Sequence, residues 1–356
     1  MYVDNVHLIN IRGFENVEFS LRRADGSYAG WTVFTGDNGS GKSTLLKAIA
    51  LGIMYGRDEY AAATALLPNF NGWIREQTQA ESAGVNLAMY AKKSDDIVSV
   101  ADPAHSAFKE WLKVGYLRFK TSFFLKKISN KTIKHKAHLH SWVMNENEDI
   151  VTQSGWFSCG YGPFRRVAGA SAEATQLMSN PVTERYATMF QEAASLFEVD
   201  QWLRKLSHKA LEGKPDAKAQ LELVLEILRD DLMPNQITVD RVDSDGLWLK
   251  DRNGLQLAWG DMSDGYRSAV ALLADILRHM MNAYGVDGLS ARDADGKLFI
   301  TRSGVVLIDE IDAHLHPEWQ QKIGFWLTSH FPHIQSLGTT HSPISCQAAD
   351  DNGLFV

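Results

Sequence analysis

Cysteine is scarce in this chain of 356 residues: it occurs only as Cys159 and Cys346, far apart and in apolar segments. Such a pair provides no disulfide framework, so we expect a reduced, cytoplasmic protein. Long hydrophobic runs are also missing: no stretch of about 18 apolar residues occurs, and we expect no membrane-spanning segment. Residues 2–11 already have a strand-like pattern, whereas a signal peptide would begin with a charged and then an apolar segment.

An excess of positive charge is missing as well. The chain has 36 Lys and Arg against 43 Asp and Glu, which gives a formal net charge of −7. This balance argues against a globally basic nucleic-acid-binding protein and leaves room for local basic patches. Hydrophobic residues make up 45% and charged residues 22% of the chain, as in ordinary globular proteins. The length allows one large α/β core with a second lobe.

Glycine is concentrated in residues 36–43, which read GDNGSGKS. They fit the phosphate-loop pattern G-x-x-x-x-G-K-[S/T] and lie between the strand-like residues 31–35 and the helix-like residues 44–51. Glycines let backbone N–H groups turn toward phosphate oxygens, and the helix that follows adds the positive end of its dipole. We therefore expect a nucleoside triphosphate here, in contact with Gly36, Asp37, Asn38, Gly39, Ser40, Gly41, Lys42, Ser43 and Thr44.

Two side chains of this loop have specific expected roles. Lys42 neutralises the β- and γ-phosphates, and the Ser43 hydroxyl completes a Mg²⁺ site. Upstream, alternating residues predict strands over 6–11 and 17–21, with a tight turn at 25–26. Arg12 ends the first of these strands, and it either reaches the nucleotide or is a solvated turn residue.

Two acidic residues end a second buried strand, VVLI at 305–308. Ligands of α/β sheets bind beyond the carboxyl ends of the strands. We expect Asp309 to hold the Mg²⁺ hydration shell and Glu310 to orient or deprotonate the attacking water. In the alternative interpretation, both acids merely cap the next helix. His341 follows another strand-like stretch, 335–340, and an imidazole there can form a hydrogen bond with a γ-phosphate.

A serine and a glycine, Ser263 and Gly265, precede a predicted long helix over 269–281. A helix N-terminus of this kind attracts anions, although the same pattern also occurs in ordinary helix caps. Farther upstream, a predicted buried strand at 155–161 runs into a Gly- and Pro-containing loop. We expect Arg165 and Arg166 after this loop to face a phosphate.

The middle of the chain gives weaker signals. We expect a strand over 85–90, helices over 183–208 and 216–232, and three short strands over 237–242, 246–249 and 255–259. A basic stretch either contacts a nucleic-acid backbone or forms a solvated loop face, and it comprises Lys126, Lys127, Lys131, Lys134, His135, Lys136, His138 and His140. A metal site made of its three histidines is disfavoured, because no Cys or carboxylate set accompanies them at ligand spacing.

The chain resembles the ATP-binding-cassette (ABC) ATPases of the SMC/Rad50/RecF type in the order of four motifs: GDNGSGKS, MSDGYRS, VVLIDEIDAHLHP and TTHSP. The resemblance implies an α/β fold, a P-loop NTPase of ABC-ATPase type with an N-terminal mixed or antiparallel β layer and a helical lobe. It implies a split ATP-binding core, 1–55 and 255–356, and an inserted lobe, 56–254, with central strands, the basic stretch and a helical subdomain.

The same resemblance assigns roles to the motif residues. It implies that Ser263 and Gly265 cap the γ-phosphate of ATP bound to a partner subunit, and that residues 314–316 form the D-loop. It also implies that Glu310, Lys42 and His341 are catalytic, with His341 as the switch histidine. Arg12 is similar to the N-terminal arginine turn of Rad50-like members. The cofactors implied are ATP and Mg²⁺, the latter held by Ser43 and Asp309.

Within this family, residues 160–166, together with the second and fourth motifs, look like the Septu-type ATPases of anti-phage and retron systems. This implies slow ATP hydrolysis, a head-to-tail homodimer or higher even oligomer, and an HNH-type nuclease partner. DNA or a retron RNA–DNA element is a further implied partner. The resemblance implies no membrane partner. The alternatives are a RecF/Rad50-like DNA-repair clamp and a transporter ATPase subunit. The family's Q-loop glutamine is missing after residue 161, and only Gln77 or Gln79 could replace it.

Overall fold

The computed structural model describes residues 1–56, 60–68, 70, 72–76, 81–92, 116–129, 132–141, 157–167, 169 and 171–356. Within these ranges, only the backbone is described for residues 55–56, 60, 91–92, 116–119, 128–129 and 132–141. The predictions for Gln77, Gln79 and Lys131 lie outside the described residues.

A parallel sheet forms the centre of the molecule, with the strand order β15-β3-β14-β13-β7. Its strands are β3 (Gly30–Phe34), β7 (Phe157–Tyr161), β13 (Gly304–Ile308), β14 (Ile334–Thr339) and β15 (Leu354–Phe355). The continuous apolar runs of β3 and β13 suit strands that are covered on both faces. Because all pairs are parallel, the carboxyl ends of these strands lie along one edge.

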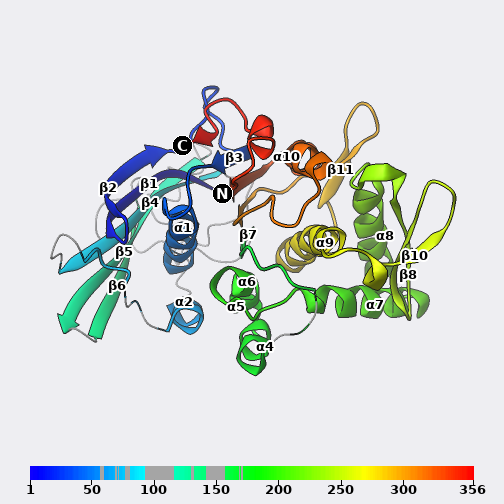
Figure 1. Cartoon of the computed structure of the whole chain (residues 1–356), viewed down its shortest axis with the longest axis horizontal. Helices are drawn as coiled ribbons and strands as arrows, with labels where there is room; N and C mark the ends of the chain where they lie inside the picture. Colours follow the sequence, from blue (N-terminus) through cyan, green and yellow to red (C-terminus); the bar gives the residue numbers. More distant parts are fainter. Residues whose placement is uncertain are drawn as a thin grey trace, which may run out of the picture.

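A second, antiparallel sheet has the order β2-β1-β4-β5-β6. Its strands are β1 (Tyr2–Ile11), β2 (Phe14–Ser20), β4 (Ser82–Lys92), β5 (Tyr116–Ser129) and β6 (Thr132–Ser141). Helix α1 (Lys42–Gly56) contacts β4 and β5 of this sheet and β13 and β14 of the central one. It therefore lies between the two sheets, with one apolar core around it (Figure 1). The antiparallel sheet is the N-terminal β layer predicted from the motifs.

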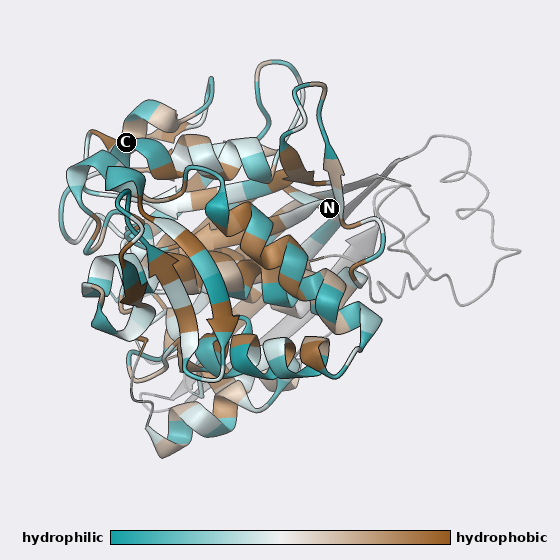
Figure 2. Ribbon diagram, turned by 90° about the vertical axis from the view of Figure 1, so that its right-hand side faces the viewer, coloured by the Kyte–Doolittle hydropathy of each residue, from teal (hydrophilic) through white to brown (hydrophobic). Residues whose placement is uncertain are grey.

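The opposite face of the central sheet is covered by helices. They are α7 (Phe197–Leu211), α8 (Pro215–Arg229), α9 (Asp264–Tyr284) and α10 (Pro317–His330). Their buried residues form a second core with the other face of the strands. Along β13, Val305 and Leu307 belong to the core around α1, and Val306 and Ile308 to the core around α9. Figure 2 shows hydrophobic and hydrophilic residues alternating along the helices.

Smaller elements complete the described part of the chain. Below the sheet in Figure 1 lie the helices α2 (Tyr60–Leu66), α4 (Ala172–Met178), α5 (Pro181–Glu184) and α6 (Ala187–Phe190). The remaining strands are β8 (Thr238–Asp243), β9 (Gly246–Lys250), β10 (Gln256–Ala258), β11 (Ser290–Arg292) and β12 (Leu298–Ile300). Short 3₁₀ helices are η2 (Pro234–Gln236), η3 (Trp259–Asp261) and η4 (Ser345–Ala348). Among the described residues, no helix is both long and apolar enough to cross a bilayer.

The structure corrects the single helical segment predicted over 183–208. This range is divided among α5, α6 and α7. Backbone hydrogen bonds to the region of β7 interrupt it: Gly160 donates to the Arg185 carbonyl at 2.8 Å, and Leu196 donates to the Arg166 carbonyl at 2.7 Å. Because these partners are distant in sequence, the helical periodicity of residues 183–208 cannot reveal them.

Two observations bear on the predicted division into a core and an inserted lobe. Strand β7 belongs to the range 56–254 but pairs with β13 in the central sheet. Strands β4 and β5, from the same range, pair into one sheet with β1. The division into a core and an inserted lobe therefore stays a proposal, and in it β7 belongs to the core. All members of the basic stretch except Lys131 lie in strands β5 and β6, not in the loop of the second interpretation.

Candidate functional site

The predicted motifs meet at the carboxyl edge of the central sheet. The register pairs Phe34 with Thr339, Gly338 with Ile308, and Ile308 with Tyr161. The residues that directly follow these strands are the phosphate loop, the acidic pair, the switch segment and the loop after β7. Parallel pairing thus brings together segments that are up to about 300 residues apart in sequence.

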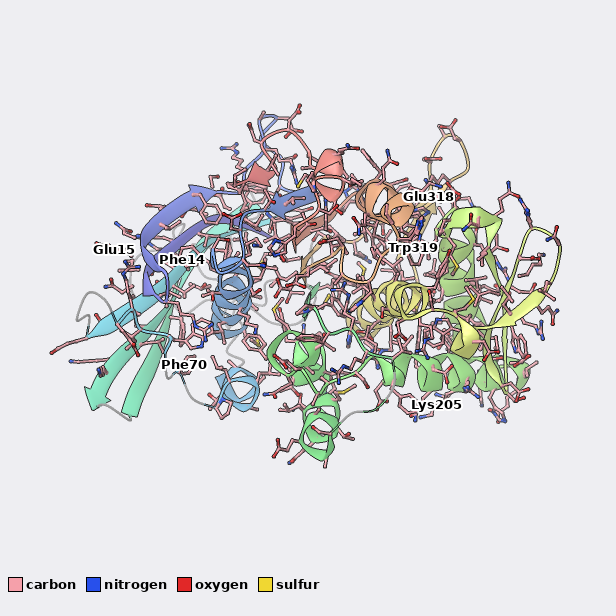
Figure 3. All side chains as sticks on the ribbon, in the orientation of Figure 1. Phe14, Glu15, Phe70, Lys205, Glu318 and Trp319 are labelled. Atoms are coloured by element: carbon pink, nitrogen blue, oxygen red, sulfur yellow. The ribbon has the colours of Figure 1, made fainter. Side chains whose placement is uncertain are left out.

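The phosphate loop has the backbone that its glycines predict. Gly36, Gly39 and Gly41 have φ values of 142°, 85° and 99°, a backbone region that residues other than glycine rarely adopt. Gly41 also has no room for a side chain, because a Cβ there would lie 2.7 Å from the Phe14 ring. Figure 3 labels Phe14, which begins β2. The antiparallel sheet therefore supports the loop from one side.

Lys42 is folded inward over this loop. Its ammonium group donates to the carbonyl oxygens of Gly36 at 2.8 Å and Asp37 at 2.9 Å. The residue is only 9% exposed, so its charge is held within the curve of the loop. A phosphate in that curve would meet a positioned cation together with the first N–H groups of α1.

The side chain of Arg12 lies beside the first turn of α1, the helix that follows the phosphate loop. Its backbone has a φ of 46°, and its Nη1 donates to the Thr44 hydroxyl at 3.3 Å. The guanidinium lies 5.2 Å from the centre of the Trp73 ring, which orients it by a cation–π contact. The side chain is exposed but held beside the phosphate loop. Its contact with a nucleotide stays a prediction.

The acidic pair is fixed by a threonine of the neighbouring strand. Asp309 is 2% exposed, and its Oδ1 accepts from the Thr339 hydroxyl at 2.6 Å. The same hydroxyl accepts from the Glu310 N–H at 2.7 Å. Glu310 has a φ of 48°, an unusual backbone state for a residue other than glycine. One hydroxyl thus holds both acids, and no motif in the sequence signals this role of Thr339.

The available donors fit a magnesium ion. Mg²⁺ is usually bound through one or two carboxylates, a few waters and substrate phosphates. Ser43 offers a hydroxyl, and Asp309 offers the carboxylate oxygen that Thr339 leaves free. Among the described residues, no group of three or more His, Cys, Asp and Glu could hold a metal.

The predicted signature turn heads a helix on the other side of the sheet. Ser263 is the N-cap of α9, is exposed, and makes no side-chain capping hydrogen bond. The helix packs in the core that contains Val306, whereas α1 packs in the core that contains Leu307. The phosphate loop and the signature turn of one chain therefore head helices on opposite faces of the sheet.

His341 is exposed in the segment that follows β14. Hydrogen bonds around it fix this segment. Thr340 donates to Asp312 at 2.5 Å, and Ser342 donates to the side-chain oxygen of Gln320 at 2.7 Å. The imidazole thus lies beyond the carboxyl end of β14. This strand pairs with β13, which leads into the acidic pair.

The prediction that Arg165 faces a phosphate is wrong. This residue is 4% exposed, and its guanidinium donates to the backbone carbonyls of Asp309 at 2.7 Å and Glu310 at 3.0 Å. Burial lowers the pKa of Arg165 to about 10, although the nearby Asp309 opposes this shift. Arg166, in contrast, is exposed. The sequence signals a loop with two arginines but not the carbonyl acceptors of Arg165.

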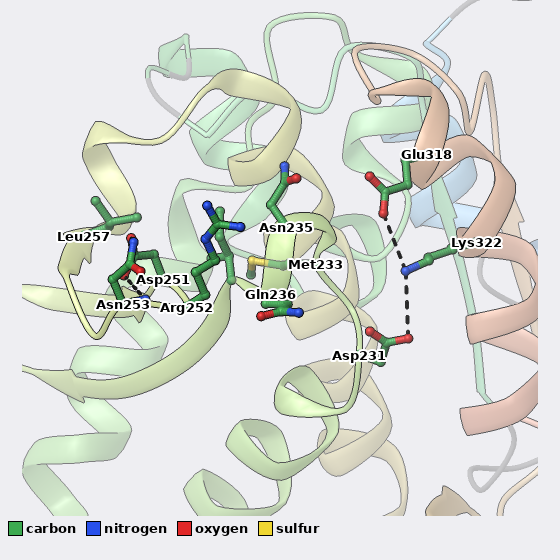
Figure 4. A pocket seen from close by; sticks show the side chains of 11 residues that line it. Asp231, Met233, Asn235, Gln236, Asp251, Arg252, Asn253, Leu257, Glu318 and Lys322 are labelled. Carbon is green, nitrogen blue, oxygen red and sulfur yellow. Dashed lines mark hydrogen bonds and ion pairs between the residues drawn. The ribbon is translucent and has the colours of Figure 1, made fainter.

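A separate cleft of about 880 Å³ lies between the β9–β10 turn, the segment after α8 and α10. Figure 4 shows Lys322 within reach of Glu318 and Asp231 in this cleft, at 3.7 and 3.9 Å. None of the residues that line it belongs to the motifs at the strand ends. We therefore take the carboxyl edge of the sheet as the candidate site.

Comparisons with known proteins agree with this geometry. A family model described as "AAA domain" matches residues 5–223, and one described as "AAA domain, putative AbiEii toxin, Type IV TA system" matches residues 180–346. The chain is 26% identical over 360 residues to the Septu protein PtuA of Bacillus mycoides (strain KBAB4). That alignment covers 100% of this chain but only 40% of PtuA, so the chain spans less than half of that relative's length.

A second relative and a solved structure give the same picture. The Retron Ec83 probable ATPase of Escherichia coli is 25% identical over 409 residues, covering 99% of this chain and 71% of that protein. An SMC head crystallised with the C-winged helix domain of ScpA superposes with a TM-score of 0.50 at 13% identity. It covers 98% of this chain and 93% of that chain, and at this identity it shows the fold alone. The expected ABC-type ATPase fold and the resemblance to Septu and retron ATPases are confirmed.

Proposed function

We infer that this protein is an ATPase. The inference starts from the chain's membership of the AAA-domain family, whose model matches residues 5–223. The observation that supports this best is the meeting of four strand ends at one edge. There, the phosphate loop binds the triphosphate, and Lys42 neutralises its β- and γ-phosphates. Mg²⁺, held by Ser43 and Asp309, would offset the charge that develops on the phosphoryl oxygens.

Glu310 is the residue that we propose as the base. It follows Asp309 directly, and the Thr339 hydroxyl holds its N–H, so its carboxylate projects from a fixed turn. A carboxylate in this position can orient a water molecule and accept its proton as the water attacks the γ-phosphate. His341 would form a hydrogen bond with the same phosphate. Thr44 and Arg12 extend the contacts of the nucleotide at the start of α1.

The site is completed by a second copy of the chain. Ser263 and Gly265 head a helix on the face of the sheet opposite to α1, which argues against their reaching the chain's own phosphate loop. In a head-to-tail dimer, the Ser263 hydroxyl and the N-terminus of α9 would instead cap the γ-phosphate bound to the partner. ATP would then bridge the two chains, and its hydrolysis would release them.

The biological role that we propose is control of an effector nuclease in anti-phage defence. The proposal comes from the similarity to a Septu protein and to a retron ATPase. We expect slow ATP hydrolysis, coupled to assembly with or release of an HNH-type nuclease, with DNA or a retron RNA–DNA element as a further partner. Dimerisation, the nuclease and the nucleic acid are all part of this proposal.

The test combines three measurements on the purified full chain. Phosphate release with ATP and Mg²⁺ measures hydrolysis, sedimentation with and without ATP measures dimer formation, and mass spectrometry of material purified from the native host identifies partners. We expect slow hydrolysis, an ATP-dependent dimer and a co-purifying nuclease. Dimerisation on duplex or gapped DNA without a nuclease would favour a repair clamp instead, and no ATP binding would refute the function.

A further inference from the structure

The loop after β7 buries an arginine against the turn that carries the acidic pair. Arg165 donates through Nη1 to the Asp309 carbonyl at 2.7 Å and to the Gly162 carbonyl at 3.0 Å. Its Nη2 donates to the Glu310 carbonyl at 3.0 Å and to the Ile311 carbonyl at 3.5 Å. One planar guanidinium thus reaches every carbonyl of the turn from 309 to 311, which only the forked geometry of arginine permits.

The same residue is bonded to the first turns of α9. The Arg165 carbonyl accepts from the Ser268 hydroxyl at 2.9 Å, and this bond is buried. Ser268 lies five residues after the N-cap Ser263. A second contact connects these regions, because Gly265 packs against the backbone carbonyl of His314. The turn at 309–311 and the signature turn are thus attached to each other through Arg165 on one side and Gly265 on the other.

The backbone of this turn needs such support. Glu310 has a φ of 48°, which persists in a residue other than glycine only when its surroundings fix it. Removing the guanidinium would also take away the donor to the buried Asp309 carbonyl, and an unsatisfied buried acceptor costs more than an average hydrogen bond is worth. Arg165 is therefore well placed to set where the Glu310 carboxylate points, although it does not itself face the phosphate loop.

We propose that Arg165 is a positioning residue that links the Glu310 turn of one ATP site to the signature turn that caps the other. This proposal rests on the proposed head-to-tail ATPase. When Ser263 engages the partner's ATP, any shift of α9 would pass through Ser268 and Arg165 to Glu310 in the same chain. Each subunit would then hydrolyse its own ATP efficiently only while it also grips that of its partner.

Two variants of the full chain test this link. Arg165→Lys keeps the charge but loses the fork, and Ser268→Ala removes the bond to α9 but keeps Arg165. Arg252→Lys is the control, because Arg252 is an exposed arginine in the β9–β10 turn, away from the motifs at the strand ends. We expect kcat to fall at least about tenfold in Arg165→Lys, with the Kd for a fluorescent ATP analogue within about twofold of the wild type. Ser268→Ala should lower kcat while the ATP-dependent dimer still forms.

Hydrogen exchange gives a readout that does not depend on hydrolysis. In Arg165→Lys, amides of residues 309–312 and of the first turns of α9 should exchange faster together, with no such change in Arg252→Lys. Unchanged kcat or unchanged exchange at both segments would overturn the inference, as would equal losses of nucleotide affinity and kcat. Failure of the wild type to hydrolyse ATP would instead refute the proposed function. The exchange data would still test whether Arg165 links the Glu310 turn to the signature turn.

Discussion

Gly265, in the first turn of α9, packs directly against the backbone carbonyl of His314. A Cβ built on the glycine would lie 2.1 Å from that oxygen, closer than real Cβ contacts come. A carbonyl oxygen is part of the backbone and cannot rotate away as a flexible side chain can. Glycine is therefore required here by close approach, between the predicted signature turn and the predicted D-loop.

Substituting this glycine should separate the two segments. We expect Gly265→Ala to lower the free energy of unfolding by about 1–3 kcal/mol and to weaken ATP-dependent dimerisation. Gly260→Ala is the matched control, since nothing lies within 4 Å of a Cβ at that position. Chemical denaturation and sedimentation with ATP measure both effects. Equal behaviour of the two variants would contradict the packing argument.

Lys42→Ala should weaken ATP binding strongly. The variant removes a charged donor that lies within the phosphate loop, and hydrogen bonds to charged groups contribute about 1.5–3 kcal/mol each. We expect affinity to fall by more than about tenfold in titrations with a fluorescent ATP analogue. Lys205→Ala, on the exposed surface of α7 (Figure 3), serves as the control and should bind as the wild type does.

Glu310→Gln should trap the ATP-bound dimer. The amide keeps the size of the side chain but cannot accept the proton of the attacking water, and loss of a general base costs about 100- to 10,000-fold. Phosphate release measures the rate, and sedimentation measures the dimer. Glu318→Gln, in the first turn of α10, should behave as the wild type. Hydrolysis by Glu310→Gln at the wild-type rate would show that another group is the base.

Ser263→Arg should separate nucleotide binding from dimerisation. The residue caps α9 on the far side of the sheet from the phosphate loop, so a single chain should still bind ATP with unchanged affinity. The bulky cation should, however, prevent ATP-dependent dimerisation, which sedimentation would measure. Ser244→Arg, in the exposed β8–β9 turn, is the control. Loss of ATP binding by the isolated Ser263→Arg chain would indicate that each chain completes its own site.

Acid should destabilise the fold through His330. This side chain is fully buried, stacks on the Trp326 ring at 4.2 Å and lies 2.9 Å from Asp230. Burial lowers its pKa below the ordinary 6.5, an effect that Asp230 opposes and Lys297 reinforces. The unfolded chain therefore binds the proton first, so this contribution to stability is complete above pH 6.5 and is lost as the pH falls below it.

Denaturation curves at several pH values between about 7 and 5 test this sign. His330→Gln should show a shallower loss of unfolding free energy with falling pH than the wild type. His208→Gln, at an exposed position on α7, should keep the wild-type slope. A steeper slope in His330→Gln would mean that the imidazole is instead stabilised in its charged form.

The sequence predicts the parts of the site that depend on local backbone chemistry. The phosphate loop needs glycines at fixed spacing, and a buried strand followed by two acids leaves few alternatives, so the sequence alone indicates both motifs. The convergence of their strands at one edge then follows from parallel pairing. The N-terminal strands were also predictable, because their alternating pattern corresponds to one buried face.

The other features depend on partners far away in the chain. Arg165 donates to carbonyls 144 and 145 residues away, and a carbonyl acceptor has no residue type that a pattern could reveal. Thr339 acts through its bond to Asp309, 30 residues away, and a single threonine at a strand end is too common to be noticed. The breaks in the predicted helix over 183–208 come from backbone bonds to the region of β7.

The alternation along β13 offers a way to observe which part of the molecule responds to nucleotide. Val306 and Leu307 are adjacent in sequence, yet their methyl groups lie in the separate interiors beside α9 and α1. Isotope-labelled methyl groups at these two positions would give nuclear magnetic resonance signals that sense different halves. A signal that moves at 307 but not at 306 when ATP is added would report a change confined to the nucleotide-binding half. Simultaneous movement would report that the helices beyond the sheet have followed.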